Sequence, residues 1–218
     1  MKMDTNEIKV MEERFTNTYI NDLWNSANGQ SKSGLGSSLE YTINFRDNLS
    51  RIIDQYNIKT IFDCSCGDWN WMKEIKNKLP KYVGNDIVKT LIDKNNFDYK
   101  SDNISFVSND MLSQLKKYED KSFDLILCRH TLEHLKNNYS VDVITEIKRV
   151  SKYAIITTNS QVEINKEISN MNGVLARSIN LKLTPFVEVL GDVVEKFYDS
   201  KGKPSTQHEC SAFLIKNY

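Results

Sequence analysis

The sequence lacks an excess of either charge: 29 lysines and arginines balance 29 aspartates and glutamates, so the formal net charge is zero. Binding to nucleic acid needs a basic face, and this balance argues against nucleic acid as a partner. No apolar run approaches the roughly 20 residues that span a bilayer. Residues 1–7 carry no apolar signal core, so we expect a soluble, cytoplasmic protein with no membrane partner.

The sequence also lacks the cysteine spacing of a redox motif. Cys64 and Cys66 are separated by one residue, not two, and cytosolic thiols are reduced by default. With Cys128 and a histidine, these cysteines could form a zinc site. The simpler explanation is that small, weakly polar residues fit the ends of buried strands, and we expect no metal.

A dinucleotide-binding fingerprint is missing as well. Residues 33–38 read Ser-Gly-Leu-Gly-Ser-Ser, and Leu39 stands where G-x-G-x-x-G requires its third glycine. This stretch is either a flexible linker between two helices or a loop beside a ligand. In the second case its glycines, beginning with Gly34, let the backbone approach the ligand closely.

Periodicity predicts two helices and then an alternating α/β pattern. Apolar residues recur at helical spacing over 8–23 and again over 45–56, with Arg46 close to the glycine-rich loop. Apolar runs at 59–63, 81–86, 104–107, 123–128 and 153–158 predict strands, and 141–150 predicts a helix. Repeated β-α units imply one parallel, doubly wound α/β sheet. We divide the chain into an N-terminal helical extension or lid, residues 1–57, and a core, residues 58–218.

The tail follows a different pattern. Residues 161–180 are expected to be helical, with a break near Gly173. Residues 193–198 and 209–215 are expected to be strands. The short turn-rich link between them, 199–204, predicts an antiparallel hairpin.

The stretch at 60–71 organises the rest of the chain. An apolar strand ends in Asp63, small residues follow, and a helix-like segment begins at Trp71. Strand, turn and helix place a ligand over the end of a parallel sheet. A phosphate site would present bare N–H groups, whereas this carboxylate suits a ligand with a positive charge or hydroxyl donors. Asp86 ends the next strand.

Three features in chain order resemble class I S-adenosylmethionine-dependent methyltransferases. Asp-Cys-Ser-Cys-Gly at 63–67 is similar to the family's first motif, and Asp86 to its ribose-binding acid. Residues 123–135, which end in Arg-His-Thr-Leu-Glu-His-Leu, resemble its fourth motif. The resemblance implies a Rossmann-like, mostly parallel seven-stranded sheet with an antiparallel C-terminal strand. It also implies S-adenosyl-L-methionine as cofactor.

The resemblance assigns roles to the strand ends. Asp63 would engage the amino group of the methionine part, with Gly67 and the Ser65 backbone beneath it. Asp86 would accept both ribose hydroxyls, and Asp110 the adenine amino group. The remaining expected cofactor contacts are Gly34, Ser37, Arg46, Trp71, Ile87 and Met111.

Two positions depart from the family pattern. Ser65 replaces the first glycine of the motif and Trp69 the last. Trp69 and Trp71 either form an aromatic wall at the ligand or pack between helix and sheet. The Gly-Asp-Trp-Asn-Trp sequence and the loop at 33–37 are similar to a small bacterial subgroup. The nearest relatives that this likeness suggests act in surface-polysaccharide pathways, including methylation of a capsular phosphoramidate.

The segment at 129–134 supplies the expected catalytic groups. His130 or His134 could take a proton from an acceptor hydroxyl, and Arg129 could hold an anionic acceptor in a bidentate contact. Alternatively, Glu133 and His134 only order the start of a helix. The pattern H-x-x-E-H also matches a zinc protease motif, but the only third ligand downstream is His208.

The sequence therefore predicts a methyltransferase that methylates an oxygen of a small molecule or glycan precursor. The oligomeric state does not follow from it. One alternative is a non-catalytic methyltransferase-like binding protein, for which Ser65 and Trp69 leave room. Others are a nicotinamide-dependent oxidoreductase, which the absent fingerprint disfavours, and a nucleic-acid methyltransferase, which the zero net charge disfavours.

Overall fold

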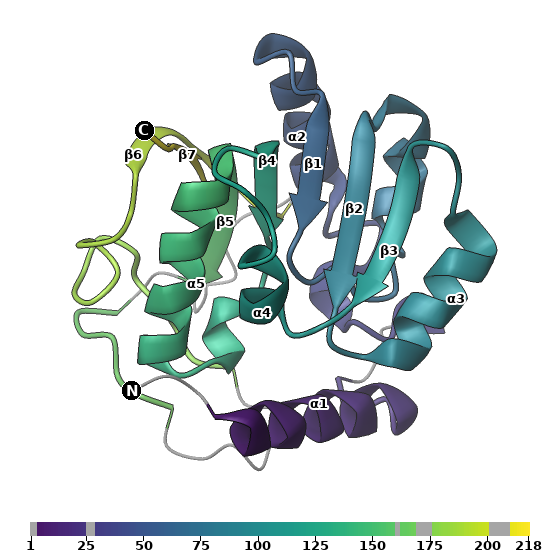
Figure 1. The fold of residues 1–218 in the computed structure, drawn as a ribbon, viewed down its shortest axis with the longest axis horizontal. Coiled ribbons are helices and arrows are strands. Elements are labelled where there is room, and N and C mark those ends of the chain that lie inside the picture. Colours follow the sequence, from purple (N-terminus) through teal and green to yellow (C-terminus); the bar gives the residue numbers. More distant parts are fainter. Residues whose placement is uncertain (1–3, 25–28, 160–161, 169–175, 201–209) are drawn as a thin grey trace.

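The fold is a seven-stranded sheet with helices on both faces (Figure 1). The computed structural model describes residues 4–24, 29–159, 162–168, 176–200 and 210–218. The strands are β1 Thr60–Asp63, β2 Lys81–Asp86, β3 Ile104–Ser108, β4 Phe123–Cys128, β5 Ser151–Asn159, β6 Asp192–Tyr198 and β7 Cys210–Lys216. The α-helices are α1 Thr5–Ile20, α2 Ile43–Gln55, α3 Lys89–Tyr99, α4 Met111–Leu115 and α5 Asn137–Val150.

The strand order is β3-β2-β1-β4-β5-β7-β6. Strands β1 to β5 pair in parallel, and β7 pairs antiparallel with both β5 and β6. The expected doubly wound sheet, its antiparallel seventh strand and the C-terminal hairpin pairing are therefore confirmed. Most of the expected turn between the last two strands lies outside the described residues.

The apolar core has two halves, one on each face of the sheet. Helices α4 and α5 pack on one face, around Tyr139 and Ile147. Helix α2 packs on the other, with Phe45 and Leu49 fully buried. Continuous apolar strands such as β4 are expected of a sheet that is covered on both sides. Helix α2 is part of this core, and the boundary at residue 57 stays a prediction.

Helix α1 lies across the carboxyl ends of the central strands (Figure 1). Its start is fixed by a capping box: Asp4 accepts a hydrogen bond from the Glu7 N–H, and Glu7 accepts one from the Asp4 N–H. The strand ends, where Asp63 and Asp86 lie, therefore face a covering helix rather than open solvent. Within the described residues, no helix is both long and apolar enough to cross a membrane.

The helix expected over 161–180 is wrong where the structure describes this segment, at 162–168 and 176–180. Asn165 explains the difference. Its side-chain amide donates to the carbonyls of Asn180 and Thr184, and its side-chain oxygen accepts from the Asn180 N–H at 2.8 Å. Side-chain bonds of this kind compete with helical backbone bonds. The expected helix after Trp71 is a 3₁₀ helix, η3 Met72–Lys78.

Candidate active site

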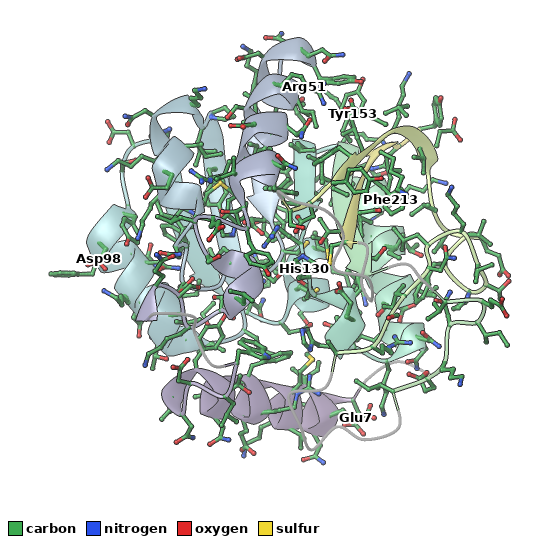
Figure 2. All side chains as sticks on the ribbon, turned by 180° about the vertical axis from the view of Figure 1, so that it is seen from behind. Glu7, Arg51, Asp98, His130, Tyr153 and Phe213 are labelled. Carbon is green, nitrogen blue, oxygen red and sulfur yellow. The ribbon has the colours of Figure 1, made fainter. Side chains whose placement is uncertain are left out.

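A cavity of about 620 Å³ lies between the carboxyl ends of the strands, helix α1 and the loop around Gly34. Figure 2 shows His130, one of its lining residues, near the centre of the molecule, between the sheet and α1. Twelve of the fourteen residues expected from the sequence line this cavity. They are Gly34, Ser37, Asp63, Ser65, Gly67, Trp71, Asp86, Ile87, Met111, Arg129, His130 and His134.

Asp63, at the end of β1, is a buried acid in the cavity wall, 3% exposed. The Tyr82 hydroxyl donates to its Oδ2 at 2.8 Å, and the Ser65 N–H to its Oδ1 at 3.4 Å. Burial raises the pKa of the Asp63 carboxyl to about 6, although the Tyr82 hydrogen bond lowers it. A positively charged ligand group would favour the ionised form, so this position suits an amino group.

Asp86, at the end of β2, lies in the same cavity. Its Oδ2 accepts from the Gly67 N–H at 3.1 Å and its Oδ1 from the Val88 N–H at 3.0 Å. Burial raises its pKa to about 6, against these backbone hydrogen bonds. Each carboxylate oxygen has a second acceptor position, so Asp86 can accept hydroxyl donors from a ligand.

Gly67 is required at its position for two reasons. Its φ of +55° lies in the left-handed region, and a Cβ there would lie 2.5 Å from the Ser33 Oγ and 3.0 Å from the Tyr19 hydroxyl. Ser65, at the first departure from the family motif, lines the cavity and shares a hydrogen bond with Thr131 through its hydroxyl.

The two tryptophans have different surroundings. Trp69 is 1% exposed and packs against Tyr82, Tyr99 and Phe106 in the core. Trp71 lines the cavity. The packing alternative therefore holds for Trp69. Trp71 packs against Phe45, with ring centroids 5.2 Å apart, and also lines the cavity, so an aromatic wall at the ligand stays a prediction for Trp71.

The loop that precedes α2 is tied across the cavity by Asp68, which the sequence analysis missed. We call residues 31–37 the strap. Asp68 accepts hydrogen bonds from the Ser31 hydroxyl at 2.9 Å, the Ser33 hydroxyl at 3.0 Å and the Lys32 N–H at 2.8 Å. Ser33 and Gly34 line the cavity from the strap. The stretch lies beside the cavity, as the second alternative expects, and its contact with a ligand stays a prediction.

Arg46 and Asp110 do not line the cavity. Arg46 donates to the Leu39 carbonyl at 2.8 Å, which turns its guanidinium toward the loop backbone. Asp110 caps α4 by accepting from the Ser113 N–H at 2.8 Å, and it also accepts from the Tyr139 hydroxyl. The carboxylate expected at the adenine is therefore outside the cavity wall, whereas Ile87 and Met111, the expected ring contacts, do line the cavity.

Arg129 is already paired with a carboxylate. Its Nε donates to Asp199 Oδ1 at 2.9 Å and its Nη2 to Asp199 Oδ2 at 2.7 Å. Nη2 also donates to the Gly36 carbonyl at 2.8 Å. Asp199, which follows β6, was missed from the sequence because it lies 70 positions from Arg129.

His130 lies between two carboxylates. Its Nδ1 is 3.2 Å from Glu133 Oε1 and its Nε2 is 2.9 Å from Asp199 Oδ2. Burial lowers the pKa of His130, but the charge of Asp199 and the two hydrogen bonds raise it to about 9. At neutral pH the imidazole therefore carries both protons, and the role of general base is not available to His130 in this arrangement.

His134 lies elsewhere in the cavity wall. Its ring is 6.1 Å from that of Phe15 and 5.7 Å from that of Trp24, measured between centroids. The segment Leu132–His134 is a 3₁₀ helix rather than the α-helix that a zinc protease motif needs. Among the residues that the structure describes, no three His, Cys, Asp or Glu side chains are grouped to hold a metal.

The fold is α/β, and its cavity lies at the carboxyl ends of the parallel strands, where folds of this class bind their ligands. A family model described as a methyltransferase domain matches residues 62–154, which run from the end of β1 through β2, β3 and β4 into β5. No curated protein sequence matches the chain.

Solved structures share the fold at low sequence identity. A 1,6-didemethyltoxoflavin-N1-methyltransferase from Burkholderia thailandensis has a TM-score of 0.68 at 11% identity and covers 100% of this chain and 91% of its own. The N-methyltransferase NodS from Bradyrhizobium japonicum has a TM-score of 0.64 at 13% identity, with coverages of 92% and 98%. An S-adenosylmethionine-dependent methyltransferase from Clostridium acetobutylicum has a TM-score of 0.61 at 14% identity, with coverages of 81% and 92%.

The expected resemblance is confirmed: residues 62–154 match a methyltransferase domain, and the similar solved structures include an S-adenosylmethionine-dependent methyltransferase. The resemblance implies S-adenosyl-L-methionine as cofactor, and the residues of the cavity fit it. Two buried carboxyls whose pKa values burial has raised, Asp63 and Asp86, suit the ammonium and the ribose hydroxyls. Gly67 lets Ser33 and Tyr19 pack closely against the turn beside them.

Proposed function

We propose that this protein transfers a methyl group from S-adenosylmethionine to an oxygen atom of a small molecule or glycan-linked group, such as a capsular phosphoramidate. One observation carries the proposal. Asp63 and Asp86, from neighbouring strand ends, line one cavity and are joined through the turn at Gly67. S-Adenosylmethionine carries an amino group and a ribose on one molecule, and a pair of neighbouring acids suits these two groups.

The cavity can exclude water from the reaction. Helix α1 and the strap cover it, and the rings of Phe15 and Trp24 form part of its wall. Methyl transfer is an in-line displacement that loses the sulfonium charge, so alignment and a dry site are the main requirements. A cavity of about 620 Å³ that also holds the cofactor leaves room for a small acceptor group.

The charge state of His130 favours an acceptor oxygen that is already ionised. An unactivated alcohol needs a base, and His130 holds its proton at neutral pH. Nitrogen is the competing acceptor atom, because two of the similar structures are named as N-methyltransferases. Product analysis by mass spectrometry and NMR separates O-methyl from N-methyl products.

The test of the proposal is the thermal stability of the protein with S-adenosylmethionine, S-adenosylhomocysteine or NAD. At 100 times Kd a ligand stabilises the fold by about 2.7 kcal/mol. We expect both adenosyl ligands to raise the melting temperature, and Asp63→Asn to reduce the effect. The exposed Asp93→Asn on α3 is the control. A response to NAD alone would contradict the proposal and support an oxidoreductase.

A second experiment, acceptor screening, separates an enzyme from a non-catalytic binding protein. Trp69 packs in the core, so the second departure from the family motif does not reach the cavity wall. If S-adenosylhomocysteine binds but acceptor screening with labelled S-adenosylmethionine yields no methylated product, the non-catalytic alternative is supported.

A further inference from the structure

We propose that Arg129 and His130 form a binding site for one oxyanion of the methyl acceptor, a carboxylate or phosphoryl oxygen, and that Asp199 occupies this site when no acceptor is bound. The proposal rests on the methyltransferase function proposed above and names the chemical class of its acceptor.

The first argument is the geometry around Asp199. One oxygen, Oδ2, accepts from both Arg129 Nη2 at 2.7 Å and His130 Nε2 at 2.9 Å, while Oδ1 accepts from Arg129 Nε at 2.9 Å. A planar guanidinium fork with a further N–H on the same oxygen matches the shape of a carboxylate or phosphoryl group. All three residues line the cavity, so a ligand there can reach them.

The second argument is that both cations are held in place by groups other than Asp199. Arg129 donates to the Gly36 carbonyl at 2.8 Å, and its guanidinium carbon lies 5.2 Å from the Phe45 ring centroid and 5.4 Å from that of Trp71. If the Asp199 carboxylate moved away, these contacts would keep the guanidinium in its place.

His130 is fixed in the same way. The backbone N–H of His130 donates to the Thr157 hydroxyl at 2.8 Å, and the Nδ1 of its imidazole lies 3.2 Å from Glu133 Oε1. Its backbone φ of +49° is in the left-handed region, a conformation that persists in a non-glycine residue only where the surroundings impose it. Asp199, by contrast, comes from a separate element, at the end of β6.

The third argument is charge. Among the described residues that line the cavity, Arg129 is the only arginine or lysine, and Glu40, Asp63, Asp68 and Asp86 are acids. Arg129, His130 and the neighbouring Glu133 leave one net positive charge when Asp199 is removed, which matches a monoanionic group. Burial lowers the pKa of His130 and the charge of Asp199 raises it to about 9, so an oxyanion in the place of Asp199 would supply the same charge and keep the imidazole protonated at neutral pH.

An oxyanion could come from the acceptor or from the carboxylate of the cofactor itself. The experiment separates these sources with S-adenosylhomocysteine, which brings the cofactor carboxylate and no acceptor. Acetate and inorganic phosphate serve as the anion probes. The readout is the NMR signal of the His130 imidazole, assigned by His130→Gln in a chain with three histidines.

In protein saturated with S-adenosylhomocysteine, we expect Asp199→Ala to bind acetate or phosphate at least 10-fold more tightly than the wild type, because its internal competitor is gone. The Arg129→Gln/Asp199→Ala double variant should lose this gain. Asp192→Ala, at the opposite end of β6, should behave as the wild type. Equal affinity in Asp199→Ala and the wild type, or retained binding in the double variant, would overturn the proposal.

Anion binding that occurs only without S-adenosylhomocysteine would assign the site to the cofactor carboxylate and overturn the acceptor assignment. If Asp199→Ala does not fold, titration of the wild type decides: a saturable shift of the His130 signal that Arg129→Gln abolishes supports the proposal, and no shift refutes it. Failure of S-adenosylhomocysteine to bind at all is a different result, because it contradicts the methyltransferase function.

Discussion

The N–H of Gly67 donates a hydrogen bond of 3.1 Å to Oδ2 of Asp86. The bond joins the turn after β1 to the end of β2, so the two halves of the proposed cofactor site are one connected unit. A change on either side of this contact should therefore affect the other.

Asp86→Asn should weaken S-adenosylhomocysteine binding by about 10- to 100-fold. The substitution removes the negative charge that accepts the ribose hydroxyls, and a hydrogen bond to a charged group contributes about 1.5–3 kcal/mol. Isothermal titration calorimetry measures the change. Asp93→Asn, an exposed acid on α3, should leave the affinity unchanged. Unaltered affinity in Asp86→Asn would place the ribose elsewhere.

Gly67→Ala should destabilise the protein more than Gly29→Ala does. Both glycines have positive φ, +55° and +70°, so both substitutions cost about 1–2 kcal/mol in backbone strain. Only at Gly67 would the new Cβ meet the Ser33 hydroxyl, at 2.5 Å, whereas no atom of the described residues lies within 4 Å of a Cβ at Gly29. We expect an additional loss of about 1–3 kcal/mol in the free energy of unfolding, measured with urea. Equal losses would mean that Ser33 moves away without cost.

Cofactor affinity should increase between pH 5 and 7. Burial raises the pKa of Asp63 and Asp86 from 3.8 to about 6, and the ligand amino group prefers their ionised forms. The free energy of unfolding of the protein without ligand should show the opposite trend. Between pH 4 and 6 the unfolded chain has released protons that the folded state retains, so the unfolding free energy falls as pH rises. Calorimetric titration and urea unfolding at each pH measure the two trends, and Asp63→Asn should flatten both.

Asp68→Ala should release the strap. The substitution removes the acceptor for Ser31, Ser33 and the Lys32 N–H. Amide hydrogen exchange over residues 31–37 should then become at least about 10-fold faster, because local opening costs less free energy. Asp93→Ala, which breaks an exposed ion pair with Lys89, is the matched control. Unchanged exchange would mean that the remaining contacts of the strap suffice to hold it.

The acids of the candidate site that lie at the ends of strands could be predicted from the sequence. Asp63 and Asp86 end apolar runs, and parallel strands bring such ends to one edge, so local pattern was sufficient. Asp68 and Asp199 were missed because their partners lie 35 and 70 positions away and nothing local marks the pairing. The helix expected over 161–180 was wrong because Asn165 binds backbone groups of a distant segment, which periodicity does not record.

The charge of His130 is the feature that most changes the chemistry expected from the sequence. From the sequence, a histidine that follows a strand at a proposed methyl-donor site is expected to act as a base. Burial lowers the pKa of His130, but its contacts with Glu133 and Asp199 raise this pKa to about 9.

Asp199→Asn should therefore lower the His130 pKa toward its ordinary value of about 6.5. Titration of the imidazole signals by NMR measures this shift, with His130→Gln for assignment. Because the wild-type imidazole stays protonated between pH 6 and 8, the turnover rate should not change in this range through titration of His130. In Asp199→Asn the turnover rate should change with pH in this range. A wild-type His130 that titrates near 6.5 would restore it as a candidate base and return an alcohol to the list of acceptors.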